Sequence, residues 1–235
     1  MSVDTQISKI AIVGSGAVGS FYGAVIQASN PNIEVHFLMR SDLEAVKANG
    51  LKVISDERDD FHLSQIRCAA TTEAIGPVDL VLIALKTTDN QSLIDYLPPL
   101  LHDSTAIMTL QNGLGNEDFL ADHFGADRIL GGLCFVCINR RGPGVVHHMA
   151  HGLIEMGEFA VQRQNERTER IAELFKSAEI PCVIRENLMQ ARWRKLIWNI
   201  PFNGLAISEG GIDVQKLLSD SSGASRPRGG SKRKR

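Results

Sequence analysis

The chain has 235 residues, of which 43% are hydrophobic and 22% charged, and its formal net charge is −2. This composition is typical of a globular protein with a sizeable core. No run approaches the roughly 20 apolar residues of a membrane span, and the acidic balance gives no reason to expect nucleic-acid binding. The first residues lack the layout of a signal peptide, so we expect a cytoplasmic protein with no membrane or nucleic-acid partner.

The N-terminal third alternates apolar runs with helical patterns. Residues 9–13 predict a strand that ends at glycines, and residues 17–28 predict a helix. A second strand at 33–39 ends at Arg40, and Ser41 is expected to cap a helix that extends to residue 48. Further strands are expected at 51–54, 61–68 and, as a run buried on both faces, 79–85.

The alternation continues beyond residue 90. Helices are expected at 91–97, 117–123 and 166–178, and strands at 105–110, 129–138, 144–148, 153–156 and 182–184. The pattern predicts an α/β protein with an N-terminal Rossmann-type doubly wound sheet over residues 1–185. A truncated helical domain is expected at 186–218, and a disordered basic tail at 219–235.

The segment Gly14-Ser15-Gly16-Ala17-Val18-Gly19 fits the pattern G-x-G-x-x-G between a predicted strand and a predicted helix. In this context the glycines allow a tight turn, close approach of a pyrophosphate and close helix-to-strand packing. The helix N-terminus adds free N–H groups and a partial positive charge. The segment predicts a dinucleotide site, and a glycine turn without a ligand is the alternative.

Arg40 stands where NAD-binding domains place an acidic residue for the ribose 2′-hydroxyl. A guanidinium at this position favours the 2′-phosphate of NADP through paired, charge-assisted hydrogen bonds. We therefore expect NADPH as the cofactor. A solvated surface arginine is the alternative.

Two polar residues follow predicted strands, and ligands of open α/β sheets lie at such strand ends. Lys86 could contact the ribose or a phosphate of the cofactor, and Asn112 could orient the nicotinamide or a substrate. A lysine whose aliphatic stem covers apolar surface and an asparagine in a turn remain open alternatives.

The predicted C-terminal helix carries Lys195, Asn199 and Asn203 at a spacing of four residues. Each step of four advances only about 40° around a helix, so the three side chains share one face. An ammonium beside two amides could bind a carboxylate and a carbonyl, whereas the alternative is a solvated face. Pro201 removes one backbone donor within this helix and could kink it.

Together these motifs resemble the ketopantoate reductase family over residues ~8 to ~218. The resemblance is carried by the glycine turn, Arg40, Leu85-Lys86, residues 111–115, residues 144–152 and the series Lys195, Asn199 and Asn203. It implies NADPH-dependent reduction of 2-dehydropantoate, a 2-keto acid, to pantoate in pantothenate and coenzyme A biosynthesis.

The resemblance also implies roles for individual residues. Lys195 would be the proton donor, and Asn112, Asn199 and Asn203 would bind the substrate. Lys86, Asn112 and Asn139 would line the NADPH site. A homodimer through the helical domain is a further expectation.

The sequence departs from the family beyond residue 218, where a Ser/Gly/Arg/Lys tail replaces a helical region that supplies a serine and a glutamate to the substrate site. We therefore expect NADPH binding to survive better than reduction. The basic residues 232–235 are similar to a nuclear-localisation signal, but we interpret them as a solvated chain end.

The cysteines and histidines of the sequence do not predict a redox or metal site. Cys134 and Cys137 have redox or metal spacing but lie in an apolar strand without a second pair nearby. His147, His148 and His151 are expected to be structural or surface residues, so no metal site is predicted. Two alternative functions stay open: an NADP-dependent reductase of another 2-keto acid, and a non-catalytic NADPH-binding module.

Overall fold

The computed structural model describes residues 7–160, 165–208, 210, 211 and 216, and the predicted tail at 219–235 lies outside them. The chain forms two compact units, Met1–Arg192 and Trp193–Arg235. The first unit contains the sheet, and the last helix, α6 (Leu188–Ser208), begins in the first unit and continues into the second. The boundary expected after residue 185 stays a prediction.

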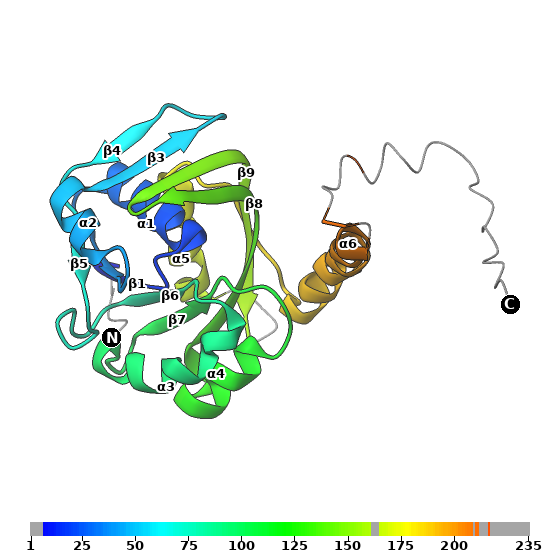
Figure 1. Ribbon diagram of the computed structural model, residues 1–235. Helices are drawn as coiled ribbons and strands as arrows, with labels where there is room; N and C mark the ends of the chain where they lie inside the picture. Colours follow the sequence, from blue (N-terminus) through cyan, green and yellow to red (C-terminus); the bar gives the residue numbers. More distant parts are fainter. Residues whose placement is uncertain (1–6, 161–164, 209, 212–215, 217–235) are drawn as a thin grey trace, which may run out of the picture. The chain divides into compact units, whose positions relative to one another are not determined.

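Ten strands of the described residues form one sheet (Figure 1). Six neighbouring strands pair in parallel and have the strand order of a doubly wound Rossmann-type sheet. In spatial order they are β5 (Arg67–Ala69), β2 (Glu34–Leu38), β1 (Lys9–Val13), β6 (Leu80–Ile83), β7 (Ala106–Thr109) and β8 (Ile129–Gly142). The predicted α/β fold is confirmed.

The rest of the sheet is mixed. β8 turns back into the antiparallel β9 (Val145–Glu158), which pairs in parallel with β10 (Cys182–Ile184) and β3 (Leu51–Ser55). β3 pairs antiparallel with β4 (Phe61–Leu63). Helix α1 (Ala17–Ser29) contacts β1 and β2 as well as β3, β8 and β9, so the sheet curls around this helix.

Alternate residues of the buried strands face two separate cores, because successive side chains of a strand point to opposite faces. Ile10 and Ile12 of β1 pack with α1 and with α5 (Glu166–Ser177). Ala11 and Val13 pack on the opposite face, with α3 (Leu93–Tyr96) and α4 (Asn116–Phe124). Figure 1 shows these helix pairs on opposite sides of the parallel strands. The continuous apolar runs of β1 and β6 follow from this burial on both faces.

Several predicted elements differ from the observed ones. The single strand expected at 61–68 is wrong: β4 and β5 occupy its two ends and lie at opposite edges of the sheet. The strands expected at 144–148 and 153–156 are one strand, β9, and the helix expected at 91–97 is a 3-10 helix, Thr87–Ser92, followed by the short α3. Two further 3-10 turns lie at Pro98–Leu100 and Ala126–Arg128.

The short helix α2 (Leu43–Asn49) begins one residue later than expected, with Asp42 and not Ser41 at its N-cap. Ser41 Oγ donates a hydrogen bond to Asp42 Oδ1 at 2.8 Å instead of capping the helix.

Candidate cofactor site

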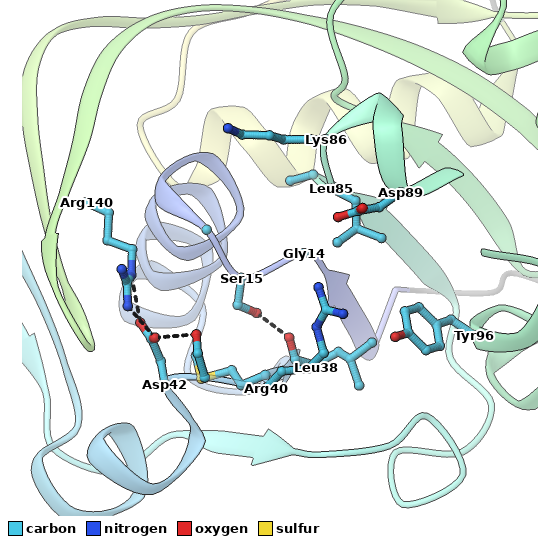
Figure 2. A pocket seen from close by; sticks show the side chains of 14 residues that line it. Gly14, Ser15, Leu38, Arg40, Asp42, Leu85, Lys86, Asp89, Tyr96 and Arg140 are labelled. Atoms are coloured by element: carbon cyan, nitrogen blue, oxygen red, sulfur yellow. Dashed lines mark hydrogen bonds and ion pairs between the residues drawn. The ribbon is translucent and has the colours of Figure 1, made fainter. Parts of the chain in front are cut away.

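A cavity of about 340 Å³ lies at the C-terminal ends of β1, β2 and β6 (Figure 2). Its walls come from residues 14–16, 38–42 and 84–86, from Asp89 and Tyr96, and from Arg140 of β8. Between β1 and β6 the order of the strands reverses direction, and open α/β sheets bind ligands at that point. The fold therefore brings the glycine turn, Arg40 and Lys86 together as predicted.

The three glycines of the turn meet different steric demands. Gly14 has a φ of +104°, and an added Cβ would lie 2.4 Å from the backbone nitrogen of Leu85. A Cβ on Gly19 would lie 2.3 Å from the carbonyl oxygen of Gly14. No atom lies within 4 Å of a Cβ built on Gly16, which lines the cavity. Gly14 and Gly19 are thus required by packing, whereas Gly16 leaves space in the cavity.

Helix α1 presents an uncapped N-terminus at the glycine turn. Gly16 is its N-cap and has no side chain to cap it, and the first turn holds no acidic residue. Ser15 Oγ donates to the carbonyl oxygen of Leu38 at 2.9 Å, which fixes the turn against the end of β2 (Figure 2). The N–H groups of the first helical turn carry partial positive charge, so this end favours an anion.

Arg40 and Lys86 are exposed cations that line the cavity. Neither side chain makes a hydrogen bond or an ion pair with any residue that the structure describes. Both positive charges are therefore available to a bound anion, and Arg40 follows β2, where a Rossmann-type sheet holds the ribose of a dinucleotide.

The cavity is lined by three more charged residues, Asp42, Asp89 and Arg140, and two of them, Asp42 and Arg140, form an ion pair. Arg140 donates from Nε to Asp42 Oδ2 at 3.0 Å and from Nη2 to Oδ1 at 2.5 Å, and the Gly144 N–H donates to Oδ2 at 3.3 Å (Figure 2 shows the two side chains). Burial alone would raise the pKa of Asp42, but the bonds from Arg140, Ser41 and the Gly144 N–H outweigh burial and lower this pKa. The hydrogen bond to Asp42 raises the pKa of Arg140, so the pair is ionised at neutral pH.

These observations test whether the residues fit a phosphorylated dinucleotide. The space beside Gly16 and the uncapped end of α1 suit a pyrophosphate, and the unpaired Arg40 suits an additional phosphate on the ribose. The residues present fit NADPH.

Two predicted cofactor residues lie outside the walls of the cavity. Asn112 is exposed beyond the end of β7, where its carbonyl oxygen accepts a hydrogen bond from Asn116 Nδ2 at 3.1 Å. Asn139 is exposed on β8, where it pairs with His147 of β9. Their roles stay predictions.

The three residues of the predicted substrate site lie on α6 within the second unit. Lys195, Asn199 and Asn203 all fall inside this helix, which continues through Pro201, so their four-residue spacing places them on one face. Lys195 and Asn199 are half-buried, and Asn203 is exposed.

The first turns of α6 are attached to the end of β7 by a buried network. Arg192 donates from Nε to Glu117 Oε1 at 2.9 Å and from Nη1 to the carbonyl oxygen of Gln111 at 2.7 Å. Gln111 Nε2 donates in turn to Asn90 Oδ1 at 2.7 Å. The network fixes the backbone that leads into Asn112.

Four residues of these contacts were not predicted from the sequence: Asp42, Arg140, Glu117 and Arg192. Arg140 lies between the strands expected at 129–138 and 144–148, and its contact with Asp42 spans 98 residues, so no local pattern could reveal it. Gly144, which donates to the same carboxylate, lay inside a segment that carried the family resemblance, and this was the only available signal.

The histidines and cysteines singled out earlier make local contacts. His147 Nε2 lies 2.9 Å from Asp56 Oδ1, and the buried His148 has its Nδ1 2.8 Å from Ser55 Oγ. Among the residues described, no group of three His, Cys, Asp or Glu side chains is arranged to hold a metal ion. Within the same residues, no helix combines the length and hydropathy that a membrane span requires.

The fold and this cavity define a Rossmann-type protein with a candidate dinucleotide site. Residues 10–161 match the family model "Ketopantoate reductase PanE/ApbA". The chain belongs to the ketopantoate reductase family, as the sequence motifs predicted.

Three relatives illustrate the similarity. A 2-dehydropantoate 2-reductase from Nostoc sp. is 41% identical over 85% of this chain and 63% of its own length. A solved 2-dehydropantoate 2-reductase from Geobacter metallireducens is 50% identical, with a TM-score of 0.81 over 84% of this chain and 64% of that one. The corresponding structure from Methylococcus capsulatus is 30% identical, with a TM-score of 0.81 over 91% and 68%. The chain thus spans less than two thirds of the first two relatives.

Proposed function

We propose that the cavity at the glycine turn binds NADPH. One observation carries the proposal: the Arg40 guanidinium lines the cavity without a partner among the described residues, at the end of β2. An acid at this position would bind the 2′-hydroxyl of NAD, whereas a guanidinium pairs with the 2′-phosphate of NADP. Gly14, Ser15, Gly16 and the first N–H groups of α1 would hold the pyrophosphate, and Lys86 would contact a ribose or a phosphate.

We further propose that the protein reduces 2-dehydropantoate to pantoate. The names of the similar proteins from Nostoc and Geobacter and the shared family support this substrate. A nicotinamide bound in the cavity would supply the hydride that the keto carbon accepts. Lys195 Nζ then stabilises the negative charge on the oxygen and donates the proton, because an ammonium can serve both purposes.

The side-chain amides of several asparagines would orient the substrate. Asn199 and Asn203 share the helix face of Lys195, and their side chains would hold the carboxylate and hydroxyl of the substrate. Asn112 would orient the substrate or the nicotinamide, and Asn139 would complete the cofactor site. The family resemblance is the support for these four roles.

The oxidation of NADPH, followed by absorbance with 2-dehydropantoate as substrate, tests the reaction. Replacing Lys195 with alanine should lower kcat by about a hundredfold or more and leave the Kd of NADPH within a factor of about two. Arg194→Ala is the matched control, because it removes a neighbouring exposed cation of the same helix. Equal losses in kcat and NADPH affinity, or no loss, would contradict the proposed role.

A panel of other 2-keto acids separates the proposed substrate from its alternatives. A kcat/KM for another keto acid above that for 2-dehydropantoate would assign a different reductase activity. NADPH binding without turnover of any keto acid would indicate a binding module. A homodimer through the helical domain and a cytoplasmic location remain predictions.

A further inference from the structure

We infer that Arg140 is a specificity-determining residue, which neutralises Asp42 so that the cavity accepts the extra phosphate of NADPH. The inference rests on the proposed cofactor. It concerns a residue of the β8–β9 hairpin, remote in sequence from the glycine turn and from β2.

The need for neutralisation follows from the position of Asp42. This aspartate lies two residues beyond Arg40, and both residues line the same cavity. An unpaired carboxylate there would repel the 2′-phosphate and would offset the attraction of Arg40. A unit charge at such a partly exposed site changes the Kd of a charged ligand by roughly fivefold to tenfold.

The geometry shows how the charge of Asp42 is neutralised. Arg140 donates hydrogen bonds to both carboxylate oxygens of Asp42. This is the bidentate geometry that a guanidinium and a carboxylate favour. The Gly144 N–H supports the same carboxylate from the other end of the hairpin turn. Asp42 is 7% exposed and lines the cavity, so its charge would act on a ligand there if Arg140 did not pair with it.

The arrangement leaves Arg40 and Lys86 as the cations available to the ligand. Arg140 also lines the cavity, but its guanidinium is engaged by Asp42. The Asp42–Arg140 pair adds little net charge to the cavity, which Arg40, Lys86 and Asp89 also line. Selection of NADPH over NADH therefore depends on keeping this pair neutral.

The test compares the Kd values of NADPH and NADH by calorimetry on the full chain. NADH lacks the 2′-phosphate, so the ratio of the two Kd values isolates the effect on that phosphate. Arg140→Gln should lower the preference for NADPH by roughly fivefold to tenfold, mainly by weakening NADPH. Arg141→Gln is the control, because its side chain contacts His147 and does not line the cavity.

A second variant excludes a structural explanation. Asp42→Asn removes the negative charge, and the Asp42 side chain makes no cap bond to α2 that the change could break, so the preference for NADPH should rise. The double variant Asp42→Asn, Arg140→Gln should return close to the original ratio. A structural role predicts instead that both single variants lower NADPH affinity. The loss in Arg140→Gln should also shrink in 0.5 M salt, because salt screens exposed charges.

The outcomes distinguish this inference from the proposed function. If the unaltered chain binds NADPH and NADH equally, the proposed cofactor is wrong and the inference falls with it. Two results would contradict the inference alone in a chain that prefers NADPH. One is an Arg140→Gln variant whose ratio of NADH to NADPH Kd values stays within a factor of two of the original ratio. The other is an Asp42→Asn variant in which that ratio falls. Should Arg140→Gln fail to fold, the Asp42→Asn result decides.

Discussion

Arg192 and Glu117 form an ion pair in which the two residues are only 3% and 4% exposed. The pair connects the beginning of α6 with α4, and Arg192 also donates to the carbonyl oxygen of Gln111. An isolated buried charge is costly, so each partner depends on the other. The contact fixes the start of the helix that carries Lys195.

Glu117→Ala should lower the free energy of unfolding by about 3–5 kcal/mol, because it leaves Arg192 buried without its counter-ion. Urea denaturation followed by circular dichroism measures this loss. The double variant Glu117→Leu, Arg192→Met should recover a large part of it, since both charges are then absent. A loss below about 1 kcal/mol in Glu117→Ala would show that the pair is not buried as described.

Alanine at the glycines of the turn should separate binding from folding. Gly16→Ala places a methyl group in open space of the cavity, so it should weaken NADPH about tenfold or more while leaving the melting temperature nearly unchanged. Gly19→Ala forces a Cβ against the carbonyl oxygen of Gly14, so it should lower stability by about 1–3 kcal/mol. Paired calorimetry and thermal melting check both variants. Equal melting temperatures for the two would contradict the described packing.

Asp79 should contribute stability that disappears in acid. Burial alone would raise its pKa, but hydrogen bonds from the backbone N–H groups of Ser8 and Lys9 and from Ser8 Oγ outweigh burial and lower the pKa. Because the pKa is lower in the folded protein, this stabilisation is complete above the unfolded value of about 3.9 and is lost as the pH falls through the folded value.

Asp79→Asn should therefore lower the free energy of unfolding by about 1 kcal/mol at pH 7. It should also reduce the loss of this free energy as the pH falls below 4. Urea titrations from pH 7 to pH 3 give both quantities. An acid limb as steep as that of the original protein would show that another carboxylate dominates.

The parallel core could be predicted because its signals are local. The strand β1, the glycine turn and α1 follow one another within 21 residues, from Lys9 to Ser29, and buried parallel strands are continuous apolar runs. The same runs explain why Arg40 and Lys86 were placed at strand ends, since a charge cannot continue a strand buried on both faces.

The remaining features depend on contacts that are distant in sequence. Residues 61–68 form one stretch suited to a strand, but only the pairing of β4 with β3 and of β5 with β2 shows that it divides. The bond between Asp42 and Arg140 requires the curl of the sheet that brings the β8–β9 hairpin back to α2. A single sequence gives no signal for either.

The binding of NADPH and NADH to the unaltered chain and to Arg40→Gln tests the central claim most directly. We predict that the unaltered chain binds NADPH at least tenfold more tightly than NADH, and that Arg40→Gln removes most of this preference with little change in NADH affinity. Lys52→Gln, which removes an exposed cation of β3 outside the cavity, should behave like the unaltered chain. Equal affinity of the unaltered chain for the two nucleotides, or an unchanged preference in Arg40→Gln, would contradict the account.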